Sequence, residues 1–130
     1  MSMTKALLAA SALIVGGAAY ADEIGMADYQ QYCATCHGVD ATGGGDLTQL
    51  MTVKVPDLTQ IAANNDGIFP MLDVIHVIDG RTGVRAHGGP MPVYGRVFTA
   101  EAAEHGTIAA ALEARGRVLS IAYYLESLQQ

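Results

Sequence analysis

The chain has 130 residues, with 7 Lys and Arg against 13 Asp and Glu and a formal net charge of −6, a size typical of one domain. Because an acidic chain without a basic cluster repels a phosphate backbone, its charge argues against nucleic-acid binding. Two cysteines are too few for the disulfide framework of a small secreted scaffold.

The first element along the chain is an apolar stretch after a basic start. Residues 6–21 are almost wholly apolar and end in Ala19-Tyr20-Ala21, an order typical of a secretory signal peptide. We therefore expect residues 1–21 to be a signal peptide and residues 22–130 to form one exported domain. The alternative is a retained membrane anchor, but the run is shorter than the about 20 apolar residues of a membrane span.

A helix is predicted over residues 24–35, where Gly25, Tyr29 and Cys33 share one face through their four-residue spacing. Glycine inside a helix costs about 1 kcal/mol relative to alanine. We therefore expect Gly25 to lie at a close crossing with another helix; the alternative is that Gly25 only frays the first turn of its helix. Residues 39–54 show no sustained period and are expected to form mostly loop.

Two shorter helices are expected in the middle of the chain. Asp57 and Gln60 have the spacing of a capping pair, and the helix that they begin should end near residues 64–67. A second helix is predicted to start at Pro70 and to end at Gly80. Its apolar stripe is expected to consist of Leu72, Ile75 and Ile78.

The last part of the chain predicts two more helices. Thr99 is a candidate cap for a short helix that reaches His105, and Thr107 is a candidate cap for the terminal helix. No strand alternation is visible. The terminal helix has apolar residues at helical spacing: Ala114, Val118, Ile121, Leu125 and Leu128.

The strongest functional signal is Cys33-Ala34-Thr35-Cys36-His37. Two thiols three residues apart face the same way on a helical turn, where each can add to a vinyl group of one haem edge, and the adjacent imidazole can reach the iron. A thioredoxin-type dithiol would sit beside a βαβ pattern, a zinc site would need further ligands at suitable spacing, and a disulfide here would close a very small loop. The motif therefore predicts one covalently bound haem c, with Cys33 and Cys36 as its thioether residues and His37 as an axial iron ligand.

The second axial ligand is expected to be Met91, which lies in His87-Gly88-Gly89-Pro90-Met91-Pro92. Two glycines permit a close backbone approach and two prolines stiffen the segment. His87 is the strongest competitor. The other mature methionines are interpreted as core residues and His76 as a surface or hydrogen-bonded residue; those methionines are Met26, Met51 and Met71.

The chain resembles class I c-type cytochromes, especially bacterial periplasmic monohaem carriers. The resemblance rests on a set of motifs in a family-like order: Gly25 and Tyr29 before Cys33, Pro56-Asp57-Leu58-Thr59, Asp79-Gly80-Arg81, Met91-Pro92, and Ile121 with Tyr124-Leu125. It implies an all-α fold of about four to five helices around one haem c, with the first and last helices crossing. It also implies a periplasmic carrier of single electrons between two redox proteins, with no substrate turnover of its own.

The sequence departs from the family pattern in two places. Relatives commonly have a proline about nine residues after the ligand histidine, whereas this chain has Asp46 after Gly43-Gly44-Gly45, a run expected to hold the neighbouring backbone less firmly. Tyr94 stands where many relatives have a tryptophan near a haem propionate. Tyr94 and Arg81 are therefore candidate propionate contacts.

Two other functions stay open at this stage. The chain is also compatible with an electron-transfer subunit of a larger dehydrogenase or oxidase complex. A haem protein that binds ligands or acts like a peroxidase would require Met91 to leave the iron. The acidic charge favours redox partners with basic docking patches, and no membrane span is expected in the mature chain.

Overall fold

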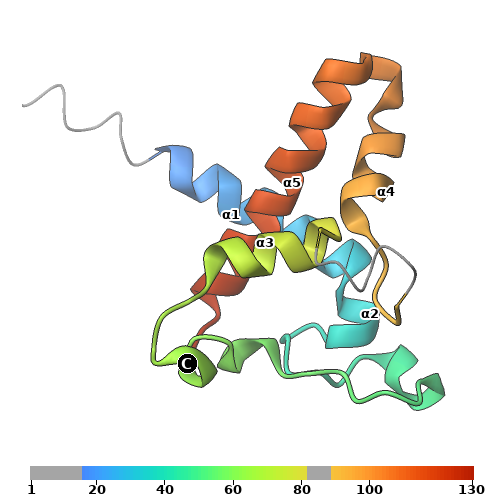
Figure 1. Cartoon of the computed structure of the whole chain (residues 1–130). Coiled ribbons are helices and arrows are strands. Elements are labelled where there is room, and N and C mark those ends of the chain that lie inside the picture. The colour runs from blue at the N-terminus through green and yellow to red at the C-terminus, as the bar shows by residue number, and fades with distance from the viewer. Residues whose placement is uncertain (1–15, 82–88) are drawn as a thin grey trace, which may run out of the picture.

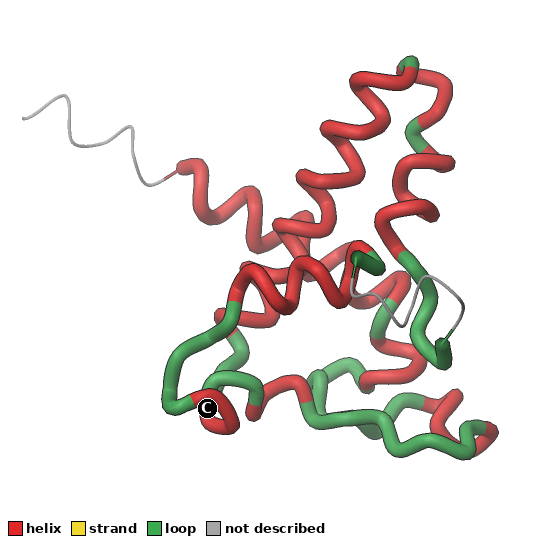
Figure 2. Tube along the Cα trace, in the orientation of Figure 1, coloured by secondary structure: helices red, strands yellow, loops and turns green. Residues whose placement is uncertain are grey.

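The computed structural model describes residues 16–81 and 89–130, with side chains from residue 23 onward. Figures 1 and 2 show helices joined by loops, and the described part of the chain has no strand. The α-helices are α1 (Gly16–Tyr32), α2 (Ala34–His37), α3 (Met71–Asp79), α4 (Tyr94–Glu101) and α5 (Thr107–Ser127). Short 3-10 helices span Asp46–Leu50, Leu58–Gln60, Ala63–Asn65 and Ala103–His105. The predicted all-α fold is confirmed.

Helices α1 and α5 cross each other (Figure 1), and Gly25 of α1 lies against α5 at this crossing. A Cβ atom at Gly25 would overlap the carbonyl oxygen of Ser120 and would lie 3.0 Å from Cβ of Tyr124. Tyr29 is fully buried one turn later, and its ring lies 5.3 Å from the ring of Tyr124. The predicted close crossing at Gly25 is therefore confirmed, and it requires a residue without a side chain.

The predicted stripe of α5 is confirmed as its core face. Ala114, Val118, Ile121 and Leu125 are buried, and Leu128 packs against the same core. Their spacing of three and four residues keeps them on one side of the helix. Helix α5 contacts both α3 and α4, so these two helices pack around it.

A charged cluster joins α1, α4 and α5 beside this core. The Arg117 guanidinium donates to both carboxylate oxygens of Asp28, at 2.7 and 2.9 Å, and to Glu101 at 2.8 Å. It also lies 3.9 Å from the centre of the Phe98 ring. The bonds to Asp28 raise the pKa of Arg117, and the bond from Arg117 lowers the pKa of Glu101, with a smaller contribution from the Tyr32 hydroxyl.

The buried face of α3 differs from the predicted stripe. Val74 and Ile78 are buried and Met71 and Ile75 pack against the core, whereas Leu72 is 63 % exposed. Positions 71, 74, 75 and 78 form one face by helical spacing, and this face meets α5 and α4. The prediction that Leu72 belongs to the buried stripe was therefore wrong. Apolar residues occur at helical spacing on more than one side of this helix, so their spacing alone does not identify the buried side.

The predicted ends of several helices need correction. Thr99 does not cap a helix, because α4 already begins at Tyr94 and the Thr99 hydroxyl donates to the carbonyl of Gly95. Gly106 rather than Thr107 occupies the cap position of α5. The chain turns at Cys33 between α1 and α2, so the predicted helix over residues 24–35 is not continuous.

Other local predictions hold in part. The Asp57 carboxylate accepts the backbone N–H of Thr59 at 2.9 Å and so caps a 3-10 helix, but the Gln60 amide donates to the Thr59 hydroxyl. Gly80 ends α3 with a left-handed conformation, φ 86°. Met26 is 48 % exposed on α1, so its interpretation as a core residue was wrong. No helix within the described ranges has the length and apolar character required to cross a membrane.

Candidate functional site

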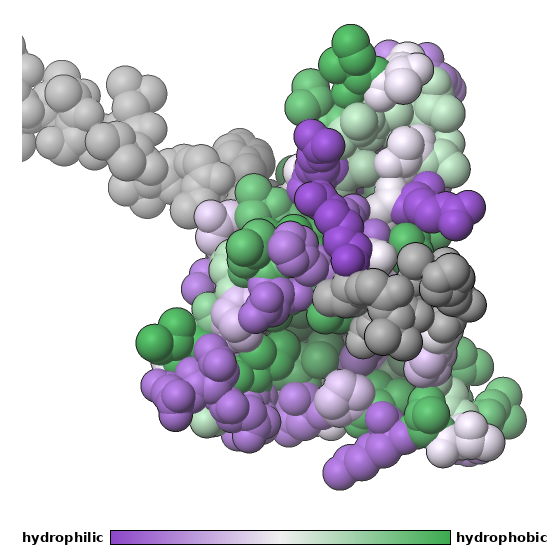
Figure 3. Space-filling model, viewed as in Figure 1, coloured by the Kyte–Doolittle hydropathy of each residue, from purple (hydrophilic) through white to green (hydrophobic). Residues whose placement is uncertain are grey.

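A cavity of about 460 Å³ lies between the α1–α2 corner, α3 and the loop before α4. In the view of Figure 3, which is that of Figure 1, hydrophobic residues gather below α3 with hydrophilic residues around them. The walls of the cavity are mostly apolar. Its residues include Tyr32, Cys33, Cys36, His37, Met51, Val55, Leu58, Ile61, Val74, Val77, Ile78, Met91, Tyr94 and Leu125.

The turn at Cys33 brings three chemically active side chains to one wall of this cavity. The backbone N–H groups of Cys36 and His37 both donate to the Cys33 carbonyl, at 3.1 and 2.8 Å. Cys33, Cys36 and His37 consequently all line the cavity, and neither cysteine is in a disulfide. Burial, followed by the negative charges of Asp28 and of the Cys36 thiolate, raises the pKa of Cys33 to about 12.

The glycine run after the motif is held more firmly than the sequence predicted. The N–H of Gly43 donates to the His37 carbonyl at 2.8 Å, and the N–H of Gly45 donates to the Cys36 carbonyl at 3.2 Å. A Cβ atom at Gly45 would overlap the Thr35 carbonyl oxygen and would lie 2.6 Å from that of Ala34. Only Gly44 of the three has open space around it. The run therefore packs against α2. The Nδ1 atom of His37 is buried.

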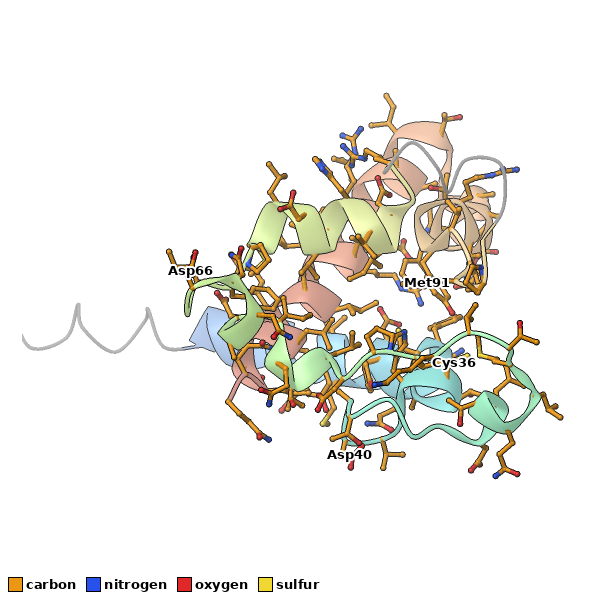
Figure 4. The ribbon with its side chains drawn as sticks, turned by 60° about the horizontal axis from the view of Figure 1, so that its bottom comes forward. Cys36, Asp40, Asp66 and Met91 are labelled. Carbon is orange, nitrogen blue, oxygen red and sulfur yellow. The ribbon has the colours of Figure 1, made fainter. Side chains whose placement is uncertain are left out.

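Met91 reaches the same cavity from a distant part of the chain. It is half-buried, packs against the core and lines the cavity together with its neighbours Pro90 and Pro92. Figure 4 labels Met91 on the loop before α4 and Cys36 on α2, with both side chains at this cavity. The competing ligand His87 lies outside the described residues.

The two candidate propionate contacts have protein partners in this structure. The Tyr94 hydroxyl donates to the backbone carbonyl of Tyr32 at 2.6 Å, and burial raises the pKa of Tyr94 to about 12. Arg81 is exposed and its Nε atom pairs with the carboxylate of Asp79. The Tyr94 hydroxyl has one proton to donate, and in this structure it donates that proton to the Tyr32 carbonyl.

Two cavity residues were missed by the sequence reasoning. Met51, interpreted as a core residue, lines the cavity, whereas Met71 packs against the core as expected. Among the described residues that line the cavity, Lys54 has a positively charged side chain. No local spacing marks either residue, because both belong to the segment between short 3-10 helices.

The residues of the cavity fit a covalently attached haem. Two thiols, an imidazole and two thioethers line one mostly apolar cavity. Its volume lies within the range of cofactor sites, roughly 300–1,000 Å³. No group of three His, Cys, Asp or Glu side chains in the part of the chain that the structure describes is arranged to hold a metal ion. The zinc alternative therefore has no ligand set in that part.

The family model described as cytochrome c matches residues 23–110. This range covers more than half of the chain and contains both the motif at Cys33–His37 and Met91. No curated protein and no solved structure matched the chain.

Proposed function

The chain belongs to the cytochrome c family, and we propose that it is a periplasmic monohaem carrier that moves single electrons between two redox proteins. A cytochrome c domain binds covalent haem c and serves in electron transfer, and the family generally consists of carriers rather than enzymes. The observation that carries the proposal is the meeting of Cys33, Cys36, His37 and Met91 in one cavity, although Met91 is far from the motif in sequence.

We assign a role to each of these side chains. Cys33 and Cys36 would form the thioether bonds to a haem, and His37 and Met91 would bind its iron. The bound haem supplies reversible one-electron exchange at iron, and a thioether opposite an imidazole raises its reduction potential. The walls are mostly apolar, and apolar surroundings would lower the local dielectric and favour the less charged ferrous state.

Ligation by both His37 and Met91 also argues against ligand binding or catalysis at the iron. Oxygen and peroxide chemistry need an open axial position, and a firmly held Met91 closes it. The proposal therefore assigns electron transfer without substrate turnover.

Export to the periplasm is supported by residues 1–21. Their basic start, apolar run and small residues before Asp22 have the order of a signal peptide, and covalent haem attachment suits an exported protein. Helix α1 begins at Gly16, so cleavage after Ala21 shortens this helix and leaves the crossing at Gly25 within the mature chain.

Carbon monoxide binding to the ferrous holoprotein tests the assignment of Met91. We expect the wild type to bind the gas poorly, because Met91 must first leave the iron. Met91→Ala should bind it readily and should have a lower reduction potential, since the electron-withdrawing thioether is gone. Absorption spectroscopy measures carbon monoxide binding to each protein, and a redox titration followed by absorption measures each reduction potential.

Two methionine variants complete this experiment. Met71→Ala removes a methionine from the core and should leave the haem spectrum nearly unchanged. Met51→Ala tests the other thioether that lines the cavity. Rapid gas binding by the wild type would favour a ligand-binding protein, and an unchanged spectrum in Met91→Ala would move the ligand role to Met51 or His87.

A further inference from the structure

We propose that Tyr94 is a positioning residue, whose hydroxyl ties the loop that carries Met91 to the end of α1 and so holds Met91 in its ligand position. The inference rests on the proposed function, because it takes Met91 to be the axial ligand. It assigns to Tyr94 a task different from the propionate contact that the sequence suggested.

The hydrogen bond joins two segments that both line the cavity. The Tyr94 hydroxyl donates to the Tyr32 carbonyl at 2.6 Å across 62 residues of sequence. Tyr32 is the last residue of α1 and precedes Cys33, whereas Tyr94 is the first residue of α4 and follows Met91 by three positions. The bond therefore links the wall that carries the cysteines to the wall that carries Met91.

The segment between Met91 and Tyr94 is short and stiff. It consists of Pro92, whose ring restricts φ, and Val93, whose side chain packs against Gly80 at the end of α3. Because so little chain separates them, Met91 cannot move far from the cavity while Tyr94 stays in place. Restraining Tyr94 thus restrains Met91.

Tyr94 itself is held on several sides. Its side chain is buried, with its ring 6.0 Å from that of Tyr32 and 5.8 Å from that of Phe98. Because the Tyr94 side chain is buried, leaving its hydroxyl without a hydrogen-bond partner is unfavourable. Withdrawal of Met91 together with Tyr94 would leave the Tyr32 carbonyl and the Tyr94 hydroxyl unpaired with each other.

The test variant is Tyr94→Phe in the ferric holoprotein, which removes the hydroxyl and keeps the ring. Two quantities are measured: the sulfur-to-iron charge-transfer band, which reports methionine ligation, and the binding constant for added imidazole. We expect a weaker band and an imidazole binding constant higher by about three- to tenfold, the size expected for the loss of one hydrogen bond.

Two controls separate positioning from a general loss of stability. Tyr123→Phe removes a hydroxyl from an exposed tyrosine on α5 and should change neither quantity. Gly25→Ala introduces a Cβ atom against the Ser120 carbonyl at the α1–α5 crossing, and it should lower the unfolding midpoint without changing the band or the imidazole affinity.

Each outcome decides the inference. A change in both quantities confined to Tyr94→Phe supports it. If the wild-type band persists unchanged in Tyr94→Phe and the imidazole affinity is also unchanged, the inference is overturned while Met91 ligation stands. An equal change of both quantities in Gly25→Ala also overturns it. A wild type without the band, together with an unaffected Met91→Ala spectrum, overturns Met91 ligation and this inference with it.

Discussion

At Gly45 the absence of a side chain decides how the loop after the motif meets α2. The Cβ atom of an alanine there would overlap backbone oxygen atoms of the motif helix, which cannot rotate away as a side chain can. We expect Gly45→Ala to lower the free energy of unfolding by about 1–3 kcal/mol. Guanidinium melts of the two holoproteins measure this difference.

Gly44 is the matched control for that substitution. It belongs to the same glycine run, but a Cβ atom at this position meets nothing within 4 Å. Gly44→Ala should leave the midpoint nearly unchanged or raise it slightly, because alanine has less conformational freedom in the unfolded chain. Equal midpoints for the two alanine variants would mean that Gly45 does not pack closely against α2.

Glu101 makes the stability of the fold depend on acidic pH. Hydrogen bonds from Arg117 and then Tyr32 hold the pKa of Glu101 below its ordinary value of 4.5, so this carboxylate stabilises the folded state above that pH. The contribution is lost as the pH falls below about 4.5 and the carboxylate is protonated.

We therefore expect Glu101→Gln to lose less stability than the wild type between pH 5 and pH 3. Since the Glu101 side chain is 40 % exposed, solvent screening keeps the difference to a few tenths of a kcal/mol, roughly. Urea melts across this pH range measure it, with the exposed Glu126→Gln on α5 as a control. Parallel pH profiles for Glu101→Gln and the wild type would contradict the prediction.

At the scale of helices, the crossing of α1 and α5 depends on one glycine and tolerates another change nearby. Gly25→Ala should lower the free energy of unfolding by about 1–3 kcal/mol, because its Cβ atom meets the Ser120 carbonyl. Gly116 is also helical but has open space around it, so Gly116→Ala should raise stability by up to about 1 kcal/mol. Thermal melts compare both variants, and effects of the same sign would exclude a close crossing at Gly25.

At the scale of the whole molecule, the cavity shows that residues 16–81 and 89–130 leave a space beside the core. About 460 Å³ remains between α2, α3 and the Met91 loop, and small domains have little other apolar area to bury. Haem binding would fill this space and would join segments that are far apart in sequence. Attachment and stable folding should accordingly be coupled.

We predict that the exported protein begins at Asp22 and carries one haem. The prediction combines the signal-like residues 1–21 with the two cysteines, which suffice for one attachment. Intact mass spectrometry of periplasmic material measures both properties at once. A mass of the full chain, or a mass without haem, would contradict the corresponding part of the prediction.

The sequence by itself determined the features that depend on short spacing. The α5 stripe follows from an apolar period of three and four residues, and the end of α3 follows from Gly80, whose left-handed conformation suits glycine. The Cys33–His37 motif places its reactive side chains on one wall, because five adjacent residues span little more than one helical turn. These features depend only on residues a few positions apart, so the sequence alone is enough to predict them.

Only the tertiary structure decided which distant residues meet. The Tyr94 hydroxyl binds a carbonyl 62 residues away, Met51 and Lys54 join the cavity, and Gly45 packs against α2. Leu72 and Met26 are exposed although their apolar character predicted burial. A periodic pattern shows that one face of a helix is apolar. Which residues this face contacts depends on how the helices pack. That packing brings together residues that have no fixed spacing along the chain.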